Sequence, residues 1–177
     1  MLTVEPIIEG RRERGGVWQE HALILDGATV ARISLHPSNR RGVTEPSIIA
    51  FDDCSYEARI VDRGKPRWTF EPARWVLCHG ESELYGAERR DAGAFRIDAP
   101  GTAPPLDFRR AHWGVNFTLS AADGGERWGG ATVVRQRLLP KLRLQHYALA
   151  FERRLPLTFQ AFLAWIVVQV ALDESDG

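Results

Sequence analysis

Short runs in which apolar and polar residues alternate fill most of the chain, and groups of turn-forming residues separate them. A period of two is typical of β-strands that bury one face of a sheet. Asp26-Gly27 stands between two such runs, and this dipeptide is a strong local signal for a β-hairpin. No segment before residue 150 keeps apolar residues at helical spacing over several turns. The pattern therefore predicts a chain of strands.

We predict about twelve short antiparallel strands, because turn signals recur at the close spacing of an all-β sandwich or barrel. Residues 1–16 are expected to be an N-terminal arm or an edge strand. The hairpin segments DGATVARI, ESELYGAERR and DGGERWGGATVV contain small residues, which should let neighbouring backbones or side chains approach closely. The predicted strands cover residues 17–25, 28–35, 47–51, 55–61, 67–71, 74–78, 83–88, 94–98, 106–110, 113–120, 127–135 and 142–151.

The segment Leu155–Leu172 is a long apolar run with two interpretations. It contains no charged residue, so it reaches the lower limit of length for a transmembrane helix. A helix from Pro156 to Leu172 would be roughly 24 Å long, whereas the hydrocarbon core of a bilayer is about 30 Å thick. Arg153-Arg154 before it and Asp173-Glu174 after it would suit a tail anchor with its basic side in the cytoplasm. A membrane anchor is therefore one alternative.

The other alternative is that the same helix fills the lumen of a barrel. The lumen widens with strand number, and about twelve strands would leave room for an α-helix roughly 10–12 Å across. A helix that strands surround must be apolar on every side. In lipid, Thr158, Gln160 and Gln169 would also need polar partners. The apolar residues that cover the whole circumference of the helix are Phe159, Phe162, Leu163, Trp165, Ile166, Val167, Val168, Val170 and Leu172.

We favour burial, and hence a mainly β fold: a single closed antiparallel barrel of about twelve strands around a buried hydrophobic C-terminal helix. The barrel is expected to span residues 17–172, with the central helix at 156–172 and an acidic tail at 173–177. The strand residues expected to face inward are Leu23, Leu25, Ile33, Phe51, Phe70, Val76, Leu77, Phe95, Ile97, Phe117, Leu119, Val133 and Leu149.

Composition and charge exclude some classes of function. The net charge is zero, so we expect no overall electrostatic attraction to nucleic acid. The N-terminus lacks the order of basic, apolar and small residues that marks a signal peptide. Cys54 and Cys78 are the two cysteines, which favours free thiols in a reducing cytosol, although a single disulfide stays open. We therefore expect a cytoplasmic protein.

Residues that commonly catalyse reactions or bind metals do not form a recognisable motif. The histidines are scattered, and Cys78-His79 has no further ligand at metal-binding spacing. Asp52-Asp53 lacks the alternating acidic positions of a calcium loop. The pairs Gly124-Gly125 and Gly129-Gly130 do not precede a helix whose N-terminus could bind phosphate. We expect no cofactor and no metal, and the sequence favours a non-enzymatic function.

Arginine pairs are the remaining candidates for a binding site. Consecutive strand residues point to opposite faces, so a pair within a strand, such as Arg109-Arg110, cannot hold one ligand together. Pairs in loops can do so, and the candidates are Arg40, Arg41, Arg89 and Arg90. If their loops meet at one rim of the barrel, these side chains could hold an anionic head group by charge-assisted hydrogen bonds. The alternative is that they only solvate their loops.

The terminal stretch RLPLTFQAFLAWIVVQVAL and hairpins such as FTLSAADGGERWGGATVV resemble the tubby-like barrel superfamily, which includes the tubby C-terminal domain and the phospholipid scramblases. The resemblance covers roughly residues 17–172 and lies in the architecture, not in a signature motif. It implies a barrel closed around a hydrophobic C-terminal helix, and binding of phosphoinositides or other phospholipids. Neither the basic site of tubby nor the calcium segment of the scramblases has a counterpart in this chain, so no binding residue is carried over.

Together these observations favour a non-enzymatic binding module for anionic phospholipid head groups, cytoplasmic and peripheral to the membrane when bound. Two other classes stay open. One is a tail-anchored membrane protein with residues 155–172 in the bilayer. The other is a small-ligand carrier or an enzyme with a pocket at the mouth of the barrel.

Overall fold

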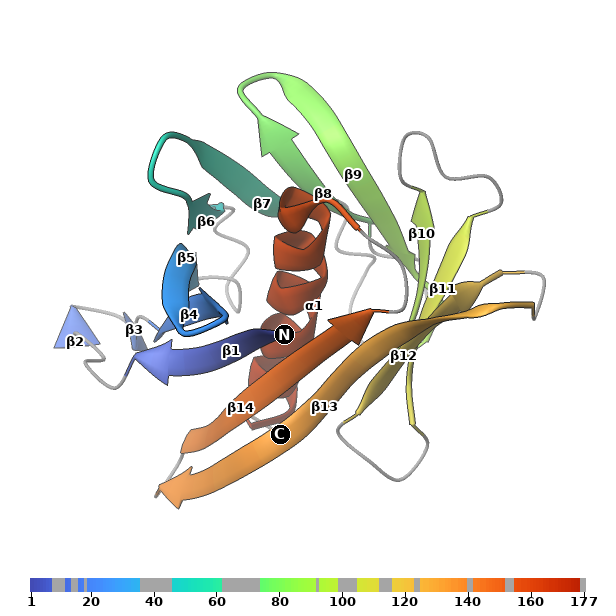
Figure 1. Ribbon diagram of the computed structural model, residues 1–177. Helices are drawn as coiled ribbons and strands as arrows, with labels where there is room; N and C mark the ends of the chain where they lie inside the picture. The colour runs from blue at the N-terminus through green and yellow to red at the C-terminus, as the bar shows by residue number, and fades with distance from the viewer. Residues whose placement is uncertain are drawn as a thin grey trace.

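The computed structural model of the chain is a closed antiparallel β-barrel with one α-helix running through its middle (Figure 1). This arrangement confirms the predicted fold class. The structure describes residues 1–7, 12–13, 16–17, 19–35, 46–61, 74–91, 93–98, 105–111, 116–122, 125–139, 142–151 and 155–175.

Twelve strands of the described residues form the barrel, and each pairs with the neighbours that it has along the circumference. A separate short hairpin consists of Arg12–Glu13 (β2) and Gly16–Val17 (β3). The barrel strands are Leu2–Ile7 (β1), Gln19–Leu25 (β4), Ala28–Leu35 (β5), Ser47–Ala50 (β6), Ser55–Val61 (β7), Arg74–His79 (β8), Ser82–Arg89 (β9), Ala94–Asp98 (β10), Leu106–Arg110 (β11), Phe117–Ala121 (β12), Arg127–Leu139 (β13) and Leu142–Phe151 (β14).

The first strand differs from the expectation of an N-terminal arm or edge strand in residues 1–16. β1 pairs with β4 on one side and with β14 on the other, so it closes the barrel. Leu2 and Val4 point inward and are buried, and this burial ties the N-terminal segment to the core. The barrel therefore begins at Leu2 and not at residue 17. The predicted strand at 67–71 lies outside the described residues.

The barrel has two ends, because consecutive strands run in opposite directions. At one end, which we call the turn end, residues 26–27, 51–54 and 80–81 join β4 to β5, β6 to β7 and β8 to β9. At the opposite end, β9 ends at Arg89 and β11 ends at Arg110. We call this the arginine end. The alternation of strand directions places the end of β5 and the start of β6 at the arginine end as well.

The helix Leu157–Ser175 (α1) runs from the turn end towards the arginine end. Near its start, the hydroxyl oxygens of Tyr85 and Thr158 form a hydrogen bond of 2.9 Å. Further along, the rings of Trp165 and Trp75 pack with their centroids 5.2 Å apart. Every residue from 161 to 170 is buried, which confirms the buried helix. The helix extends to Ser175, so Asp173 and Glu174 belong to it and not to a separate tail.

The helix contacts the interior of its own barrel, and this is not the arrangement that a tail anchor requires. Phe162 and Trp165 are fully buried among strand side chains. Among the described residues, no helix combines the length and the apolar character that crossing a membrane would take. Contact of these side chains with acyl chains would require the barrel to open.

The side chains between sheet and helix form one hydrophobic core. Alternation places every second strand residue in this core, as the period of two predicts. Of the residues expected to face inward, Phe70 lies outside the described residues, and Leu25, Phe51 and Val133 are partly buried against the core. The expected residues that are buried in this core are Leu23, Ile33, Leu77, Phe95, Ile97, Phe117, Leu119 and Leu149. The prediction was wrong for Val76, which is buried but lies between the inward-facing Trp75 and Leu77, so it points to the opposite face of the sheet.

Two glycines allow β13 to approach its neighbours closely. A Cβ on Gly130 would lie 2.0 Å from the carbonyl oxygen of Phe117, and one on Gly129 would lie 2.1 Å from that of Ala150. Gly129 also has φ +127°, a conformation that side chains disfavour. The register between β12 and β13 shifts at this point, as in a β-bulge. These contacts agree with the close approach expected from the small residues.

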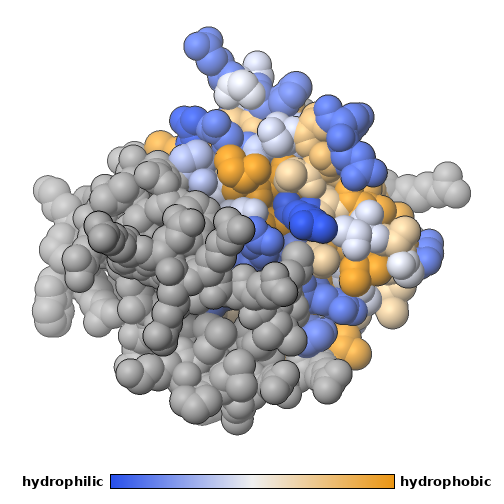
Figure 2. All heavy atoms as spheres, turned by 90° about the vertical axis from the view of Figure 1, so that its left-hand side faces the viewer, coloured by the Kyte–Doolittle hydropathy of each residue, from blue (hydrophilic) through white to orange (hydrophobic). Residues whose placement is uncertain are grey.

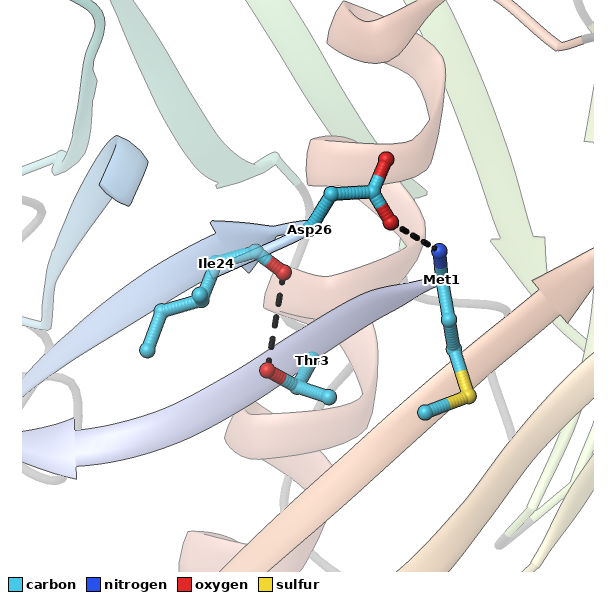
Figure 3. A network of polar contacts seen from close by, with 4 residues as sticks. All are labelled: Met1, Thr3, Ile24 and Asp26. Atoms are coloured by element: carbon cyan, nitrogen blue, oxygen red, sulfur yellow. Dashed lines mark hydrogen bonds and ion pairs between the residues drawn. The ribbon is translucent and has the colours of Figure 1, made fainter. Parts of the chain in front are cut away.

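On the described part of the side shown in Figure 2, hydrophilic and hydrophobic residues are interspersed. On the outer surface of the barrel, ion pairs join Arg59 to Glu57 and Arg109 to Asp107. At the turn end, the amino group of Met1 donates to Asp26 Oδ1 at 2.9 Å, which ties β1 to the β4–β5 turn (Figure 3). Pairs of this exposed kind contribute little to stability, so the core holds the barrel together.

Candidate functional site at the arginine end

The structure separates the two side chains of the predicted pair Arg89 and Arg90. Arg89 is the last residue of β9 and lies on the inner face, because it alternates with the buried Ala87 and pairs with the buried Phe95. Arg90 follows the strand, is exposed, and forms an ion pair of 2.7 Å with Glu88. The two guanidinium groups therefore have different surroundings. Only Arg89 reaches the interior of the barrel.

The other predicted pair, Arg40 and Arg41, lies outside the described residues. The strands on either side of it are described: β5 ends at Leu35 and β6 begins at Ser47, both at the arginine end.

A second arginine faces the interior at the same end of the barrel. Arg110 alternates with Leu106 and Phe108, which are both fully buried. Its backbone N–H donates to the carbonyl oxygen of Gly93, and a Cβ on Gly93 would lie 2.8 Å from the Cβ of Arg110. Arg110 therefore stands directly opposite Gly93, on the same face of the sheet. The aliphatic part of the Arg110 side chain lies over Gly93, since a Cβ there would also come within 3.4 Å of Arg110 Cδ.

Arg89 and Arg110 are separated by a single strand, β10. Neighbouring strands lie about 4.8 Å apart, so the two backbones are roughly 10 Å from each other. An arginine side chain is long enough for two guanidinium groups to converge across that span on one anion. Sequence reasoning missed Arg110, because it treated Arg109-Arg110 only as a pair. The alternation of Arg110 with Leu106 and Phe108 could have shown from the sequence that Arg110 faces inward.

An aromatic floor lies beneath Arg89. Its guanidinium carbon is 5.9 Å from the centroid of the Trp75 ring and 6.0 Å from that of Phe95. These two rings pack edge to face with their centroids 5.0 Å apart. A guanidinium over aromatic faces is attracted to them by cation–π interaction, which helps to fix its position. Arg89 also donates from Nε to the carbonyl oxygen of Asp91 at 3.1 Å.

The positive charge of Arg110 reaches the interior of the barrel. Tyr147 of β14 is buried, and burial raises the pKa of its hydroxyl, while the charge of Arg110 opposes part of that rise. The arginine end thus combines two inward cations with buried aromatic side chains.

Several buried polar atoms near this end lack partners. His21 pairs with the inward-facing Ile33, and Ser47 alternates with the inward-facing Ile49, so both side chains point into the barrel. His21 Nδ1, Ser47 Oγ and the indole nitrogens of Trp75 and Trp165 have no hydrogen-bond partner within the described part of the chain. Burial, together with the charge of His146, lowers the pKa of His21 to about 4. His21 is therefore neutral at pH 7.

The two cysteines lie at the turn end of the barrel. Cys54 and Cys78 are free thiols, as the sequence favoured. At the turn end, Cys54 donates to the Tyr56 hydroxyl at 3.4 Å, and this bond raises the pKa of Tyr56 to about 12. Burial raises the pKa of the Cys78 thiol. This thiol is protonated at neutral pH, which makes it a poor nucleophile. Among the described residues, no group of three or more His, Cys, Asp or Glu side chains could hold a metal ion.

Comparison with known proteins finds no family model, no curated protein and no solved structure that matches this chain.

Proposed function

We propose that this protein is a non-enzymatic binding module, and that the arginine end of the barrel binds anionic phospholipid head groups. The observation that carries the proposal is the inward placement of Arg89 and Arg110 on the two strands that flank β10. Guanidinium groups suit phosphate and carboxylate, because they donate two parallel hydrogen bonds to such anions. The resemblance to the tubby-like barrels implies the same class of ligand.

The distribution of charge supports a local site over general attraction to anions. The net charge is zero, and the outer arginines Arg59, Arg90 and Arg109 each form an ion pair with a neighbouring carboxylate. General attraction to a negative surface would need an unbalanced positive face. A ligand at the mouth of the barrel should depend on Arg89 and Arg110 because they lie on the inner face, and much less on the outward-facing arginines.

Flotation with liposomes tests the proposal. Vesicles of phosphatidylcholine with about one fifth phosphatidylserine or phosphoinositide should carry the protein upward, and vesicles of phosphatidylcholine alone should not. The double variant Arg89→Gln with Arg110→Gln should lose most of this binding, because each charged hydrogen bond contributes about 1.5–3 kcal/mol.

The matched control is the double variant Arg59→Gln with Arg109→Gln, which removes the same charge from the outer face. It should float like the wild type. Circular dichroism of all variants checks that the barrel is folded. Equal flotation of both double variants, or flotation with neutral vesicles alone, would contradict the proposal. Replacing Arg40 and Arg41 by Gln in the same assay tests whether the segment between β5 and β6 contributes.

A further inference from the structure

At the arginine end, the strand that closes the barrel parts from one of its two neighbours. β1 pairs with β4 along its whole length, but its pairs with β14 stop at Val4 and Tyr147. The rest of β14, residues 142–146, pairs only with β13 among the described residues, and β1 and β14 diverge there in Figure 1. Pro6 has no backbone N–H, which suits a strand whose ladder ends on one side. We call this junction of β1 and β14 the closing seam.

Two histidines lie beside the point where this ladder ends. His21 of β4 pairs with Pro6 of β1, and its imidazole points into the barrel and is 4% exposed. His146 is the residue of β14 next to Tyr147, at the end of the paired part. Burial and, to a smaller extent, the charge of His146 lower the pKa of His21. The two histidines therefore lie on the strands that flank β1, where β1 and β14 separate.

The described groups that face His21 do not favour its charged form. β5 places the apolar Ile33 beside it, and the buried helix residues 161–170 contain no titratable side chain. Tyr147 of β14 is neutral, because burial raises the pKa of its hydroxyl. The nearby charged residues of β1, β4 and β5 alternate with inward residues and face outward; they are Glu5, Glu20 and Arg32. Protonation of His21 is therefore unfavourable while the barrel is closed.

The closing seam is the shortest of the ladders that surround His21. Three residue pairs join β1 to β14, whereas six join β1 to β4 and seven join β4 to β5. Each ladder pair contributes backbone hydrogen bonds and contacts between facing side chains. When a change at His21 stresses this part of the wall, the closing seam should therefore give way before the ladders on either side of β4.

We infer that acid opens the closing seam: a proton on His21 favours a form in which β14 parts from β1 and water reaches the imidazole. The opened form solvates the imidazolium and moves it away from the charge that His146 acquires in acid. β1 stays paired with β4, so the barrel opens on one side without unfolding. This device does not depend on the proposed function, because it concerns only the wall of the barrel.

The size of the effect follows from the coupling between protonation and opening. His21 has a pKa of about 4 in the folded protein, against 6.5 for an unperturbed histidine. The opened fraction should therefore be small and constant above about pH 6.5, and should rise as the pH falls. Between these two values the increase should approach tenfold for each pH unit, and it should level off below about pH 4.

Hydrogen exchange of the full chain, followed by nuclear magnetic resonance from pH 6.5 to 4.5, tests the inference. Each rate is divided by the intrinsic exchange rate at that pH, so that it reports opening alone. Alternate residues of an antiparallel strand donate to opposite neighbours. The amides of β1 that donate to β14 should be at least about tenfold less protected than those that donate to β4. Their protection should fall towards acid by nearly tenfold for each pH unit.

A disulfide across the closing seam is the second measurement. Thr3 and Ala148 are direct partners on the outer face, and paired Cα atoms lie about 4.5–5.5 Å apart, which a disulfide can bridge. Thr3→Cys with Ala148→Cys is made in a chain that carries Cys54→Ser and Cys78→Ser. When this variant is oxidised, the β1 amides that donate to β14 should become as protected as those that donate to β4. The same variant in its reduced form is the matched control and should behave like the wild type.

Substitution of the histidines completes the test. His21→Leu should remove the pH dependence of exchange at the closing seam, and His79→Gln, at an exposed histidine of the turn end, should keep it. His146→Gln should make protection level off at a higher pH, because its charge no longer lowers the pKa of His21. If His21→Leu does not fold, the oxidised disulfide and His146→Gln decide the outcome. Equal protection of both sets of β1 amides, or exchange at the closing seam that ignores pH, would overturn the inference.

Discussion

At the turn end of the barrel, polar side chains near the start of the helix have partners, whereas near the arginine end several buried polar atoms have none. Tyr85 bonds to Thr158 at 2.9 Å, and Gln160 donates to the carbonyl oxygen of Leu155 at 2.8 Å. By contrast, His21 Nδ1 and Ser47 Oγ are buried without a partner among the described residues. An unsatisfied buried group costs about 1–3 kcal/mol, so the arginine end lowers the stability that the turn end helps to provide.

This difference in hydrogen bonding indicates which end of the barrel is the better candidate for a ligand site. Proteins depart from good packing and complete hydrogen bonding mainly at sites that serve a ligand. The arginine end has this character, since unpartnered donors and inward cations lie close together there. The turn end fixes the start of α1, and its contacts have an ordinary structural explanation. Four experiments test whether the two ends differ in this way.

The largest expected effect comes from Trp165, which lies on the central helix. Trp165→Ala should lower the free energy of unfolding by about 3–5 kcal/mol, because it removes a fully buried aromatic ring from the core. Urea unfolding measures this change. The control is Val134→Ala, whose side chain is 65% exposed and which should change stability by less than about 0.5 kcal/mol. A small loss for Trp165→Ala would mean that the helix is not packed inside the barrel.

His21 should make the arginine end sensitive to acid. The pKa of His21 is about 4 in the folded protein, against 6.5 for an unperturbed histidine. At a pH between these two values, His21 is therefore protonated in the unfolded chain but neutral in the folded protein. Stability should therefore be full above about pH 6.5 and fall as the pH decreases, with the loss complete below about pH 4 and near 3 kcal/mol.

Urea unfolding across this pH range, compared between wild type and His21→Leu, measures the contribution of His21. The variant should lose that part of the pH dependence. His79→Gln, at an exposed histidine of the turn end, is the control and should keep it. An unchanged pH profile in His21→Leu would show that His21 is not buried in its neutral form.

At the start of β13, Gly130→Ala should destabilise the barrel by about 1–3 kcal/mol or more, because the new Cβ would collide with the backbone oxygen of Phe117. Gly86→Ala is the matched control. Its Cβ would meet the tip of the flexible Glu83 side chain at 2.8 Å, which can move aside. Thermal unfolding of the two variants should therefore differ clearly. Equal stability would argue against the close approach of β12 and β13.

The smallest and most specific test compares one hydroxyl from each end. Tyr85→Phe removes a partnered hydroxyl at the turn end and should cost about 1 kcal/mol. Ser47→Ala removes a buried hydroxyl without a partner and should be neutral or stabilising by up to about 1–2 kcal/mol. Urea unfolding resolves both changes. If Ser47→Ala costs as much as Tyr85→Phe, the two ends do not differ in the way described here.

Much of the fold could be predicted from local patterns. The period of two identified eleven of the twelve barrel strands, because alternation depends only on one face being buried. The helix was predicted to be buried because Trp165, Ile166 and Val167 lie on different sides of it, and a helix that is apolar all round needs cover on every side. The first strand was missed, since a six-residue segment carries little information about its partners.

The candidate site could be predicted only in part. Arg89 was singled out from the sequence, but as half of a pair with Arg90, and the structure joins it instead with Arg110 across β10. Consecutive residues cannot share a face of a strand, while residues on alternate strands can. The sequence does not specify strand register, so it could not bring these two arginines together.

The sequence by itself determined the strands, their inward faces and the burial of the last helix, because each of these follows from periodicities among near neighbours. Only the tertiary structure decided that β1 closes the barrel against β14, that Arg89 and Arg110 face one interior, and that Trp75 meets Trp165. The physical reason is that these relations depend on strand register and on packing between residues far apart in the chain. A local sequence pattern does not specify such long-range contacts.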